Sequence, residues 1–243
     1  SGYVRRPGFG AEPQRGNVAR LPDRPYAPPR DPWLSVLHHD DDILVLAKPS
    51  GLLSVPGKSE DLADCLESRA VEQFPAATMV HRLDRDTSGV QVLAQNRKAH
   101  RHLGLQFERR KVQKAYVARV WGHVGEDEGR IDLPLICDWP NRPLQMVDHE
   151  HGKPAQTDWK VLERGETSDG QAVTRLALYP LTGRSHQLRV HLLSLGHPIL
   201  GDRLYAHPQA LGAADRLQLH AQSLTLHHPA DGRICTFEDP CPF

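Results

Sequence analysis

The chain has 243 residues, 39% of them hydrophobic, and equal numbers of acidic and basic side chains. This length and composition suit a globular protein of one large domain or two small lobes. No apolar run approaches the roughly 18 residues of a membrane-spanning helix, and the Pro- and Arg-rich start is unlike a secretory signal. The four cysteines have no C-x-x-C spacing, which indicates reduced thiols rather than a disulfide framework or a zinc site. We therefore expect a cytoplasmic protein with no membrane association.

The first part of the chain differs in composition from the rest. Residues 1–32 hold seven Pro and six Arg and show no hydrophobic periodicity. Such a composition predicts a flexible N-terminal extension, which can add electrostatic affinity for a polyanion. Ordered structure is expected to begin near Trp33 and to form one domain over residues 33–243.

Hydrophobic periodicity predicts the elements of that domain. In chain order, we expect a strand at 43–47, a helix at 62–74, a strand at 89–95, a basic helix at 97–110, strands at 114–122, 155–164 and 172–181, a helix at 184–196 and a strand at 217–228. Strands outnumber helices and do not alternate with them regularly. The pattern therefore predicts an α+β fold with a mixed, mostly antiparallel sheet and flanking helices, rather than a doubly wound parallel sheet.

The zero net charge conceals a strongly basic segment. From Arg82 to Arg119 there are ten Lys or Arg residues against three Asp or Glu, so this segment is +7 and the remainder −7. Arg outnumbers Lys by 23 to 7 in the whole chain, and the guanidinium group matches phosphate oxygens in pairs. A run of charge is usually a solvated helix face, but this composition favours contact with a polyanion.

Within this segment, the motif HRLDRDTSGV places Asp84 and Asp86 among arginines directly before a strand. One interpretation is a solvated turn in which the carboxylates cap the next element. A second is a phosphatase-like D-x-D site, which the arginines oppose because a divalent cation prefers several oxygen ligands and little positive charge nearby. In the third, Asp84 is a nucleophile or base kept ionised by a guanidinium, in a site that receives a polyanion.

A second group of polar residues supports the third interpretation. Thr182, Gly183 and Arg184 lie at a predicted strand-to-helix junction. Arg184 is therefore expected at the edge of the sheet, and Leu188 one turn further along the same helix face.

Three histidines in the same stretch raise the question of a metal site. His186, His191 and His197 are five and six residues apart, so they point in different directions around a helix, unlike the i, i+4 pair of zinc-binding helices. Histidines hydrogen-bonded in the core or at the surface are the better interpretation, and no metal site is expected.

Several segments together resemble the signature segments of the RluA-type pseudouridine synthases. In chain order they are KPSGLLSVPG (48–57), HRLDRDTSGV (81–90), KAYVARVWG (114–122) and TGRSHQLRVHLLSLGHPILGD (182–202). ICDWPNRP (136–143) and GKPAQT (152–157) are similar to the branch that modifies both transfer RNA and large-subunit ribosomal RNA. The resemblance covers residues 33–243. Residues 1–32 are too short and too poor in apolar residues to form the S4-type RNA-binding domain that some relatives carry.

The resemblance implies both a fold and a reaction. The fold is an antiparallel-rich sheet with a central catalytic cleft. The reaction converts uridine in structured RNA to pseudouridine: the N1 glycosidic bond breaks, the uracil turns, and C5 bonds to the ribose. The expected substrates are a 23S rRNA loop and a tRNA anticodon stem-loop. This isomerisation consumes no donor, so no cofactor or metal is expected, which agrees with the absence of phosphate-loop and metal-ligand motifs.

Residue roles are implied by the same resemblance. Asp84 matches the essential Asp, acting on the ribose as nucleophile or on its 2′ hydrogen as base. Tyr116 matches the active-site Tyr that stacks on the flipped uracil and can relay a proton. Arg184 matches the Arg that pairs with the catalytic Asp, and Leu188 would line the uracil pocket. Arg82 would replace the flipped base by stacking its guanidinium in the gap.

Further RNA contacts are expected from Lys114, Arg109 and Arg110 of the basic segment and from His81, which directly precedes it. The protein is expected to act as a monomer. Two other classes remain as alternatives: an RNA-binding module without catalysis, in which Asp84 is incidental, and a metal-dependent phosphohydrolase. Chelation by EDTA would abolish the activity of a phosphohydrolase and leave that of a pseudouridine synthase unchanged.

Overall fold

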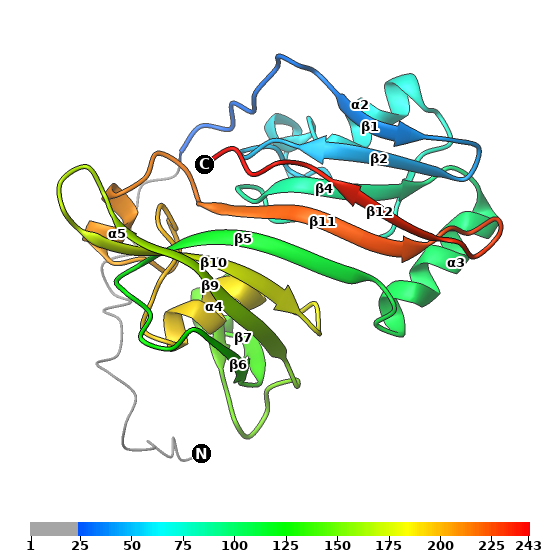
Figure 1. Ribbon diagram of the computed structural model, residues 1–243. Helices are drawn as coiled ribbons and strands as arrows, with labels where there is room; N and C mark the ends of the chain where they lie inside the picture. The colour runs from blue at the N-terminus through cyan, green and yellow to red at the C-terminus, as the bar shows by residue number, and fades with distance from the viewer. Residues whose placement is uncertain (1–23) are drawn as a thin grey trace. The chain divides into compact units, whose positions relative to one another are not determined.

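The structure, a computed structural model, describes residues 24–243, so residues 1–23 of the expected N-terminal extension lie outside the described part. The described chain forms two compact units, which can be followed by residue number in Figure 1. Residues 24–118 and Leu219–Phe243 form the N/C unit, and Arg119–Gln218 form the middle unit. The single domain expected over residues 33–243 therefore stays a prediction.

The N/C unit contains a mixed sheet. Its strands lie in the order β1 (Ser35–His39), β2 (Ile43–Lys48), β4 (Ser88–Ala94), β11 (Leu219–His227) and β5 (Gln113–Trp121), while β3 (Thr78–Met79) pairs with β4 and β12 (Ile234–Glu238) with β11. The β4–β11 pair is parallel and the other pairs are antiparallel. The last three residues of β5 belong to the middle unit. Helices α2 (Leu66–Gln73) and α3 (Arg97–Glu108) and the short 3₁₀ helix η1 (Glu60–Leu62) complete the N/C unit.

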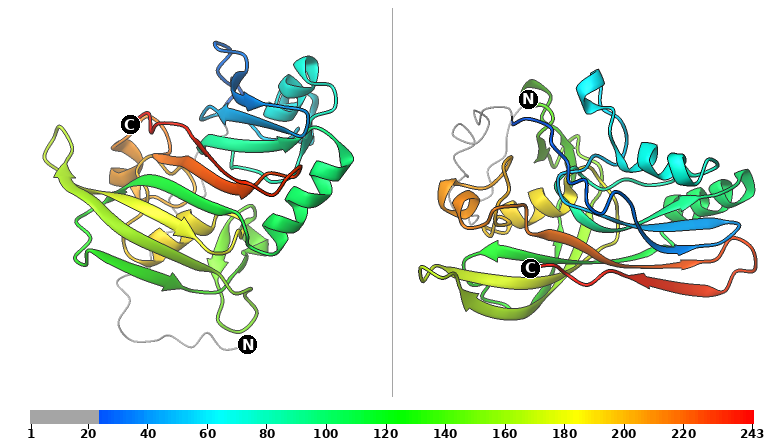
Figure 2. Two further views of the ribbon diagram at one scale, coloured as in Figure 1. Left: turned by 45° about the vertical axis from the view of Figure 1, so that its right-hand side comes forward. Right: turned by 90° about the horizontal axis from the view of Figure 1, so that it is seen from above.

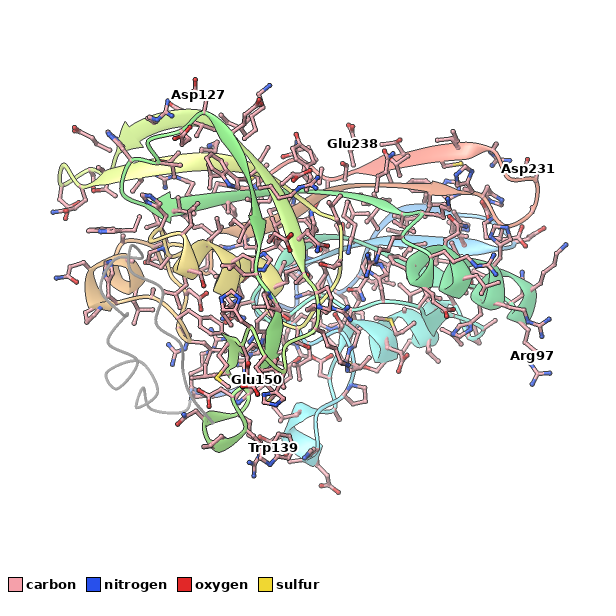
Figure 3. The ribbon with its side chains drawn as sticks, turned by 90° about the horizontal axis from the view of Figure 1, so that it is seen from below. Arg97, Asp127, Trp139, Glu150, Asp231 and Glu238 are labelled. Carbon is pink, nitrogen blue, oxygen red and sulfur yellow. The ribbon has the colours of Figure 1, made fainter. Side chains whose placement is uncertain are left out.

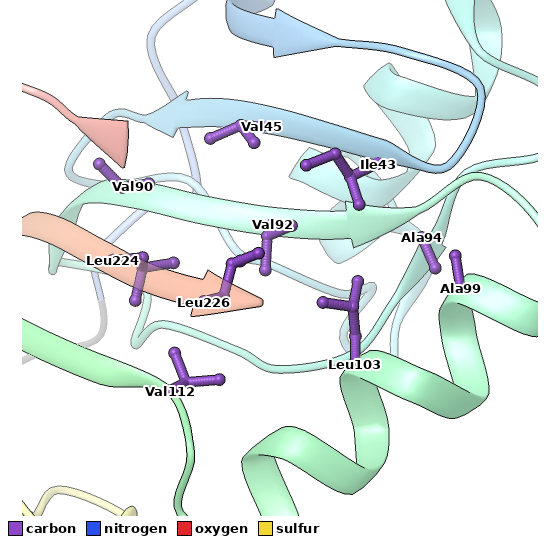
Figure 4. Close-up of a cluster of buried hydrophobic side chains, with 10 residues drawn as sticks. All are labelled: Ile43, Val45, Val90, Val92, Ala94, Ala99, Leu103, Val112, Leu224 and Leu226. Carbon is purple, nitrogen blue, oxygen red and sulfur yellow. The ribbon is translucent and has the colours of Figure 1, made fainter. Parts of the chain in front are cut away.

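Strand β2 is buried on both of its faces. Ile43 and Val45 belong to a cluster with Ala99 and Leu103 of α3, which Figure 4 shows together with residues of β4 and β11. The residues between them along the strand, Leu44 and Leu46, belong to a different cluster, with residues of α2. Because successive side chains of a strand point to opposite faces, the two clusters lie on opposite sides of β2. Each fully buried aliphatic side chain contributes about 1.5–3 kcal/mol to the free energy of folding. Strands β2 and β4 are therefore stable elements to which the neighbouring loops are attached.

The middle unit has its own antiparallel strands. β10 (Ala172–Pro180) pairs with β9 (Gln156–Glu166), which pairs with β6 (Glu128–Asp132), and both views of Figure 2 show β9 and β10 side by side. β7 (Leu135–Cys137) and β8 (Gln145–Val147) form a separate hairpin with the 3₁₀ helix η2 (Trp139–Asn141) at its tip. Helices α4 (Gln187–Ser194) and α5 (Pro208–Gly212) complete the unit.

The predicted α+β class with a mostly antiparallel sheet is confirmed. Two predicted helices begin later than expected. The helix expected at 62–74 begins at Leu66, because Cys65 is its N-cap and forms a capping box with Ser68. The helix expected at 184–196 begins at Gln187, because His186 has a left-handed backbone (φ 54°) that no helix turn can include. Arg184 therefore precedes the helix and does not share a helix face with Leu188.

Defined contacts begin before Trp33. Residues 24–32 contain no helix or strand, yet several of them are hydrogen-bonded to the N/C unit. The Tyr26 hydroxyl donates to the carbonyl oxygen of Asp64 at 2.6 Å, and the carbonyl oxygen of Pro29 accepts from Arg69 at 2.8 Å. No helix within residues 24–243 is both long enough and apolar enough to cross a membrane.

Candidate active site

The opposed charges of HRLDRD lie on a loop between β3 and β4 of the N/C unit. Arg82 is exposed, Leu83 is buried and Asp84 is half-buried. The backbone N–H of Thr87 donates to the carbonyl oxygen of Asp84 at 3.1 Å, which closes a turn directly before β4. A turn is thus present, as the first interpretation expected, but its carboxylate lies partly inside the unit.

A buried lysine and a buried serine hold the backbone on either side of Asp84. Lys48 is 1% exposed, and its Nζ donates to the carbonyl oxygens of Pro49 (2.9 Å), Leu52 (2.6 Å) and Arg85 (2.9 Å). On the other side, Ser54 Oγ donates to the carbonyl oxygen of Leu83 at 2.8 Å and accepts from its N–H at 3.1 Å. A buried ammonium is stable only when its hydrogen bonds are made. The two residues fix the position of the backbone next to the carboxylate.

The start of β4 has an anchor of its own. Ser88 Oγ lies 2.7 Å from Nδ1 of His220, and Nε2 of His220 lies 2.7 Å from the carbonyl oxygen of Asp239. Since a carbonyl oxygen only accepts hydrogen bonds, Nε2 carries the proton that it donates to Asp239. The next residue, Gly89, can only be a glycine. A Cβ at this position would lie 2.2 Å from the carbonyl oxygen of Ala221, and the φ of Gly89 is +124°.

Tyr116 of β5 lies close to Asp84. Burial raises the pKa of the Tyr116 phenol, and the negative charge of Asp84 raises it further. The phenol is therefore un-ionised at neutral pH, so any proton relay through it starts from the protonated form. Lys114 points to the same face of the strand two residues earlier, and burial lowers the pKa of its ammonium group.

The His81 ring is packed and hydrogen-bonded within the N/C unit, and it is uncharged. Its ring stacks on Phe107 with centroids 4.5 Å apart, and its Nε2 accepts the backbone N–H of Val92 at 3.0 Å. Burial lowers the pKa of His81 to about 3, and the charge of Lys114 acts in the same direction. At neutral pH His81 is uncharged and brings no positive charge to a ligand.

The other predicted site residues lie in both units. Arg109 and Arg110 are exposed just after α3, where Arg110 has a left-handed backbone (φ 57°). In the middle unit, Arg184 is half-buried, and its Nε donates to the carbonyl oxygen of Pro154 at 2.9 Å. Leu188 is 6% exposed in the first turn of α4. The structure thus brings Asp84, Tyr116, Lys114 and His81 together in the N/C unit, while the pairing of Arg184 with Asp84 stays a prediction.

The three histidines near α4 are hydrogen-bonded within the middle unit. His191 is buried between the Thr157 hydroxyl (2.8 Å) and the carbonyl oxygen of Leu133 (2.9 Å), and burial lowers its pKa. Nδ1 of His186 lies 2.5 Å from the Tyr205 hydroxyl. Nδ1 of His197 lies 2.7 Å from a backbone carbonyl oxygen. These contacts suit structural histidines.

One other group, Asp40, Asp42 and His228, has possible metal-ligand atoms within 4.8 Å of one another. Nδ1 of His228 accepts the N–H of Ala230 at 3.1 Å, so its Nε2 carries the proton that it donates to Asp40 at 2.8 Å. Binding a metal ion through Nε2 would require this proton to leave, and Nδ1 cannot take it without losing the bond from Ala230. The group therefore fits a hydrogen-bonded link between the turn after β1 and the turn after β11.

Sequence reasoning missed the residues that position the loop. Lys48 and Ser54 belong to KPSGLLS, which was interpreted only as turn signals and as a family segment. The buried Lys was detectable in the sequence as a charge at the end of the otherwise apolar strand ILVLAK. His220 gave no such signal, because its contacts are to residues far away in the chain.

The comparisons with known proteins agree with one another. The family model described as RNA pseudouridylate synthase matches residues 42–194, which include Asp84, Tyr116, Arg184 and Leu188. The chain is 56% identical over 218 residues, 90% of its length and 98% of the relative's, to the dual-specificity RNA pseudouridine synthase RluA of Salmonella typhimurium. It is 52% identical to the protein of the same name from Vibrio vulnificus, over 90% of this chain and 87% of that one. Among solved structures, human RNA pseudouridylate synthase domain containing 1 matches with a TM-score of 0.72 and 32% identity, over 92% of this chain and 87% of that one.

Proposed function

Because the chain belongs to the RNA pseudouridylate synthase family, and is thus an isomerase acting on uridine in RNA, we propose that it modifies both ribosomal and transfer RNA. The proposed targets are a loop uridine of 23S rRNA and a uridine of a tRNA anticodon stem-loop. One observation carries this proposal: relatives named as dual-specificity enzymes are 52–56% identical over 90% of the chain. The +7 charge of residues 82–119 supports binding to folded RNA.

In the proposed mechanism, Asp84 acts on the ribose of a flipped uridine. It either attacks C1′ as the N1–C1′ bond breaks, or removes the 2′ proton as the uracil departs. The uracil turns, C5 bonds to C1′, the C5 proton is lost and N1 gains one. Substrate and product have the same atoms, so the balance needs no co-reactant. The bonds from Lys48 and Ser54 support this role, because they fix the backbone on both sides of Asp84 before the RNA arrives.

The surrounding residues take distinct parts in the proposal. Tyr116 stacks on the flipped uracil, and its un-ionised hydroxyl relays the proton between C5 and N1. Arg184 pairs with Asp84 and keeps it ionised, while Leu188 lines the uracil pocket. Arg82, exposed beside Asp84, stacks where the flipped base had been.

Outside the reacting centre, the exposed Arg109 and Arg110 contact the RNA backbone, and Lys114 adds charge close to Tyr116. His81 contacts RNA only through an uncharged ring. We propose further that the enzyme acts as a monomer in the cytoplasm, where rRNA and tRNA are made in bacteria such as the organisms of its relatives. Sedimentation of the chain with and without RNA measures its oligomeric state.

The proposal is tested by mapping pseudouridine in RNA treated with the protein. Unmodified 23S rRNA fragments and tRNA transcripts are incubated with the chain and read by a pseudouridine-specific chemical stop. The proposal predicts new stops in one rRNA loop and in an anticodon stem-loop. Stops in only one class of RNA would contradict dual specificity, and stops in neither would contradict both proposed targets.

A further inference from the structure

We propose that Trp139 and Arg142, at the tip of the β7–β8 hairpin, form a stacking platform for an unpaired base of the RNA substrate. This inference rests on the proposed function, because it assumes that the bound partner is a folded RNA with unstacked bases. It assigns to the middle unit a contact with a nucleobase, separate from the roles given to Asp84, Tyr116 and Arg82.

The exposure of Trp139 is the first observation. The indole is 68% exposed, whereas the other exposed Trp or Tyr side chains among residues 24–243 are Trp33 at 36% and Tyr179 at 43%. Indole is the largest side chain and gains most from burial. An indole left largely in water therefore contributes little to folding and is available to a ligand with a flat face.

Arg142 is the second observation. Its guanidinium carbon lies 4.8 Å from the centre of the Trp139 ring, and its Nη1 donates to the carbonyl oxygen of Trp139 at 2.8 Å. Within the described residues, Arg142 has no carboxylate partner at ion-pair distance. The positive charge beside the ring is thus held in place and stays available to the phosphates that flank a stacked base.

The hairpin tip is firmly built, so the exposure of Trp139 does not come from a loose loop. Asp138 is buried and accepts from Asn141 Nδ2 at 3.1 Å, and its N–H donates to the carbonyl oxygen of Leu144 at 2.8 Å. Leu144 is buried beside Tyr205, whose hydroxyl accepts the N–H of Gln145 at 2.9 Å. Figure 3 shows Trp139 at the outer end of this hairpin. A platform fixed in advance loses little conformational entropy on binding.

The chemistry of the tip favours a nucleobase over a protein surface. The tip presents one ring with a cation beside it, together with exposed Pro140, Asn141 and Pro143, rather than a broad apolar patch. A stable protein interface buries about 800 Å² on each partner, whereas a single base needs only one aromatic face. The nearby acidic residue Asp148, at the base of the hairpin, already accepts the N–H groups of Glu150 and His151.

The first test compares RNA affinities of the full chain for a tRNA anticodon stem-loop, one of the two proposed targets. Loss of one base–aromatic stack weakens binding roughly 5- to 150-fold, so Trp139→Ala should show a loss in this range and Trp139→Phe a smaller one. Leu162→Ala is the matched control, because Leu162 is 52% exposed in the same unit and has no ring; it should bind as wild type. Trp139→Ala should leave the slope of log K against log salt unchanged, while Arg142→Ala should lower it by up to about one.

The second test identifies the stacked base. Each loop nucleotide of the RNA is replaced in turn by an abasic one, and the affinities of wild type and Trp139→Ala are compared. The platform predicts one position where the abasic change weakens wild type but not the variant. Additive losses at every position, or equal affinities of wild type and Trp139→Ala, would overturn it. A variant that changes self-association in sedimentation but not RNA affinity would also overturn it, and would assign the tip to a contact between copies.

The binding measurement tests whether the platform exists, and it does so independently of catalysis. If wild type binds RNA with the predicted coupling but forms no pseudouridine, the platform stands and the proposed targets fail. If wild type forms pseudouridine and the coupling is absent, the proposed function stands and the platform fails.

Discussion

Nζ of Lys48 donates a hydrogen bond of 2.9 Å to the carbonyl oxygen of Arg85, the residue directly after Asp84. The same ammonium donates to the carbonyl oxygens of Pro49 and Leu52, and the side chain is 1% exposed. A buried cation with three carbonyl partners thus joins the turn after β2 to the loop that carries the proposed catalytic carboxylate. The backbone directly after Asp84 is therefore held by contacts within the N/C unit.

Lys48→Met should impair catalysis more than RNA binding. Methionine has a similar length but removes the charge and all three donors, so the buried carbonyls lose their partner at a cost of about 1–3 kcal/mol of stability. A shift of about 1 Å in a catalytic group costs on the order of 100-fold in rate. We expect a loss of this order in the single-turnover rate, with RNA affinity near wild type. Lys58→Met, which changes an exposed lysine, is the control; a wild-type rate in Lys48→Met would show that other contacts hold the loop.

His81 should make the fold sensitive to mild acid. Its pKa in the folded chain is about 3, below the ordinary value near 6.5, so below about pH 6.5 the unfolded chain takes up a proton that the folded chain does not. The free energy of unfolding should therefore fall between pH 7 and 5, by a slope approaching one proton. His81→Gln should flatten this dependence in urea unfolding experiments, and His100→Gln, at an exposed histidine, should not. Equal slopes in all three proteins would contradict a neutral, half-buried His81.

Arg82→Ala should act mainly on structured RNA. Flipping a stacked base costs on the order of a few kcal/mol and least when the base is already unstacked, so an arginine that stacks in the gap matters most in a folded stem-loop. Single-turnover rates at saturating enzyme should fall strongly for the stem-loop and much less for a short unstructured RNA of the same local sequence. Equal slowing of both RNAs would assign Arg82 to positioning rather than to the gap.

Much of the fold could be predicted from local sequence patterns. Most of the contacts that hold the HRLDRD loop in place could not. The apolar strand before Lys48 and the basic helix after Asn96 have the expected periodicities. The start of α2 was misplaced because Cys65, a residue seldom used as an N-cap, accepts the N–H of Ser68. The start of α4 depends on the left-handed backbone of His186, which no local pattern indicates.

The family resemblance pointed to Asp84 and Tyr116, and the structure places them together in one unit. The contact between Lys48 and Arg85 joins residues 37 positions apart, and a contact of this kind depends on how β2 and β4 pair. The exposure of Trp139 is likewise a property of the folded hairpin, since tryptophan side chains are highly buried on average and the residue type alone does not indicate exposure.

If Asp84 performs the chemistry, the Asp84→Asn variant should fold and bind RNA but form no pseudouridine. Asn keeps the shape of the side chain but acts neither as nucleophile nor as base, so the variant should keep the wild-type melting temperature and RNA affinity. Asp86→Asn is the matched control, since Asp86 lies two residues away and pairs with Arg24. The deciding measurement is the amount of pseudouridine formed on a stem-loop that the wild type modifies. It is read by the chemical stop under single-turnover conditions. We expect no product with Asp84→Asn and near wild-type product with Asp86→Asn; turnover by Asp84→Asn above trace contamination would show that Asp84 is not the catalytic residue.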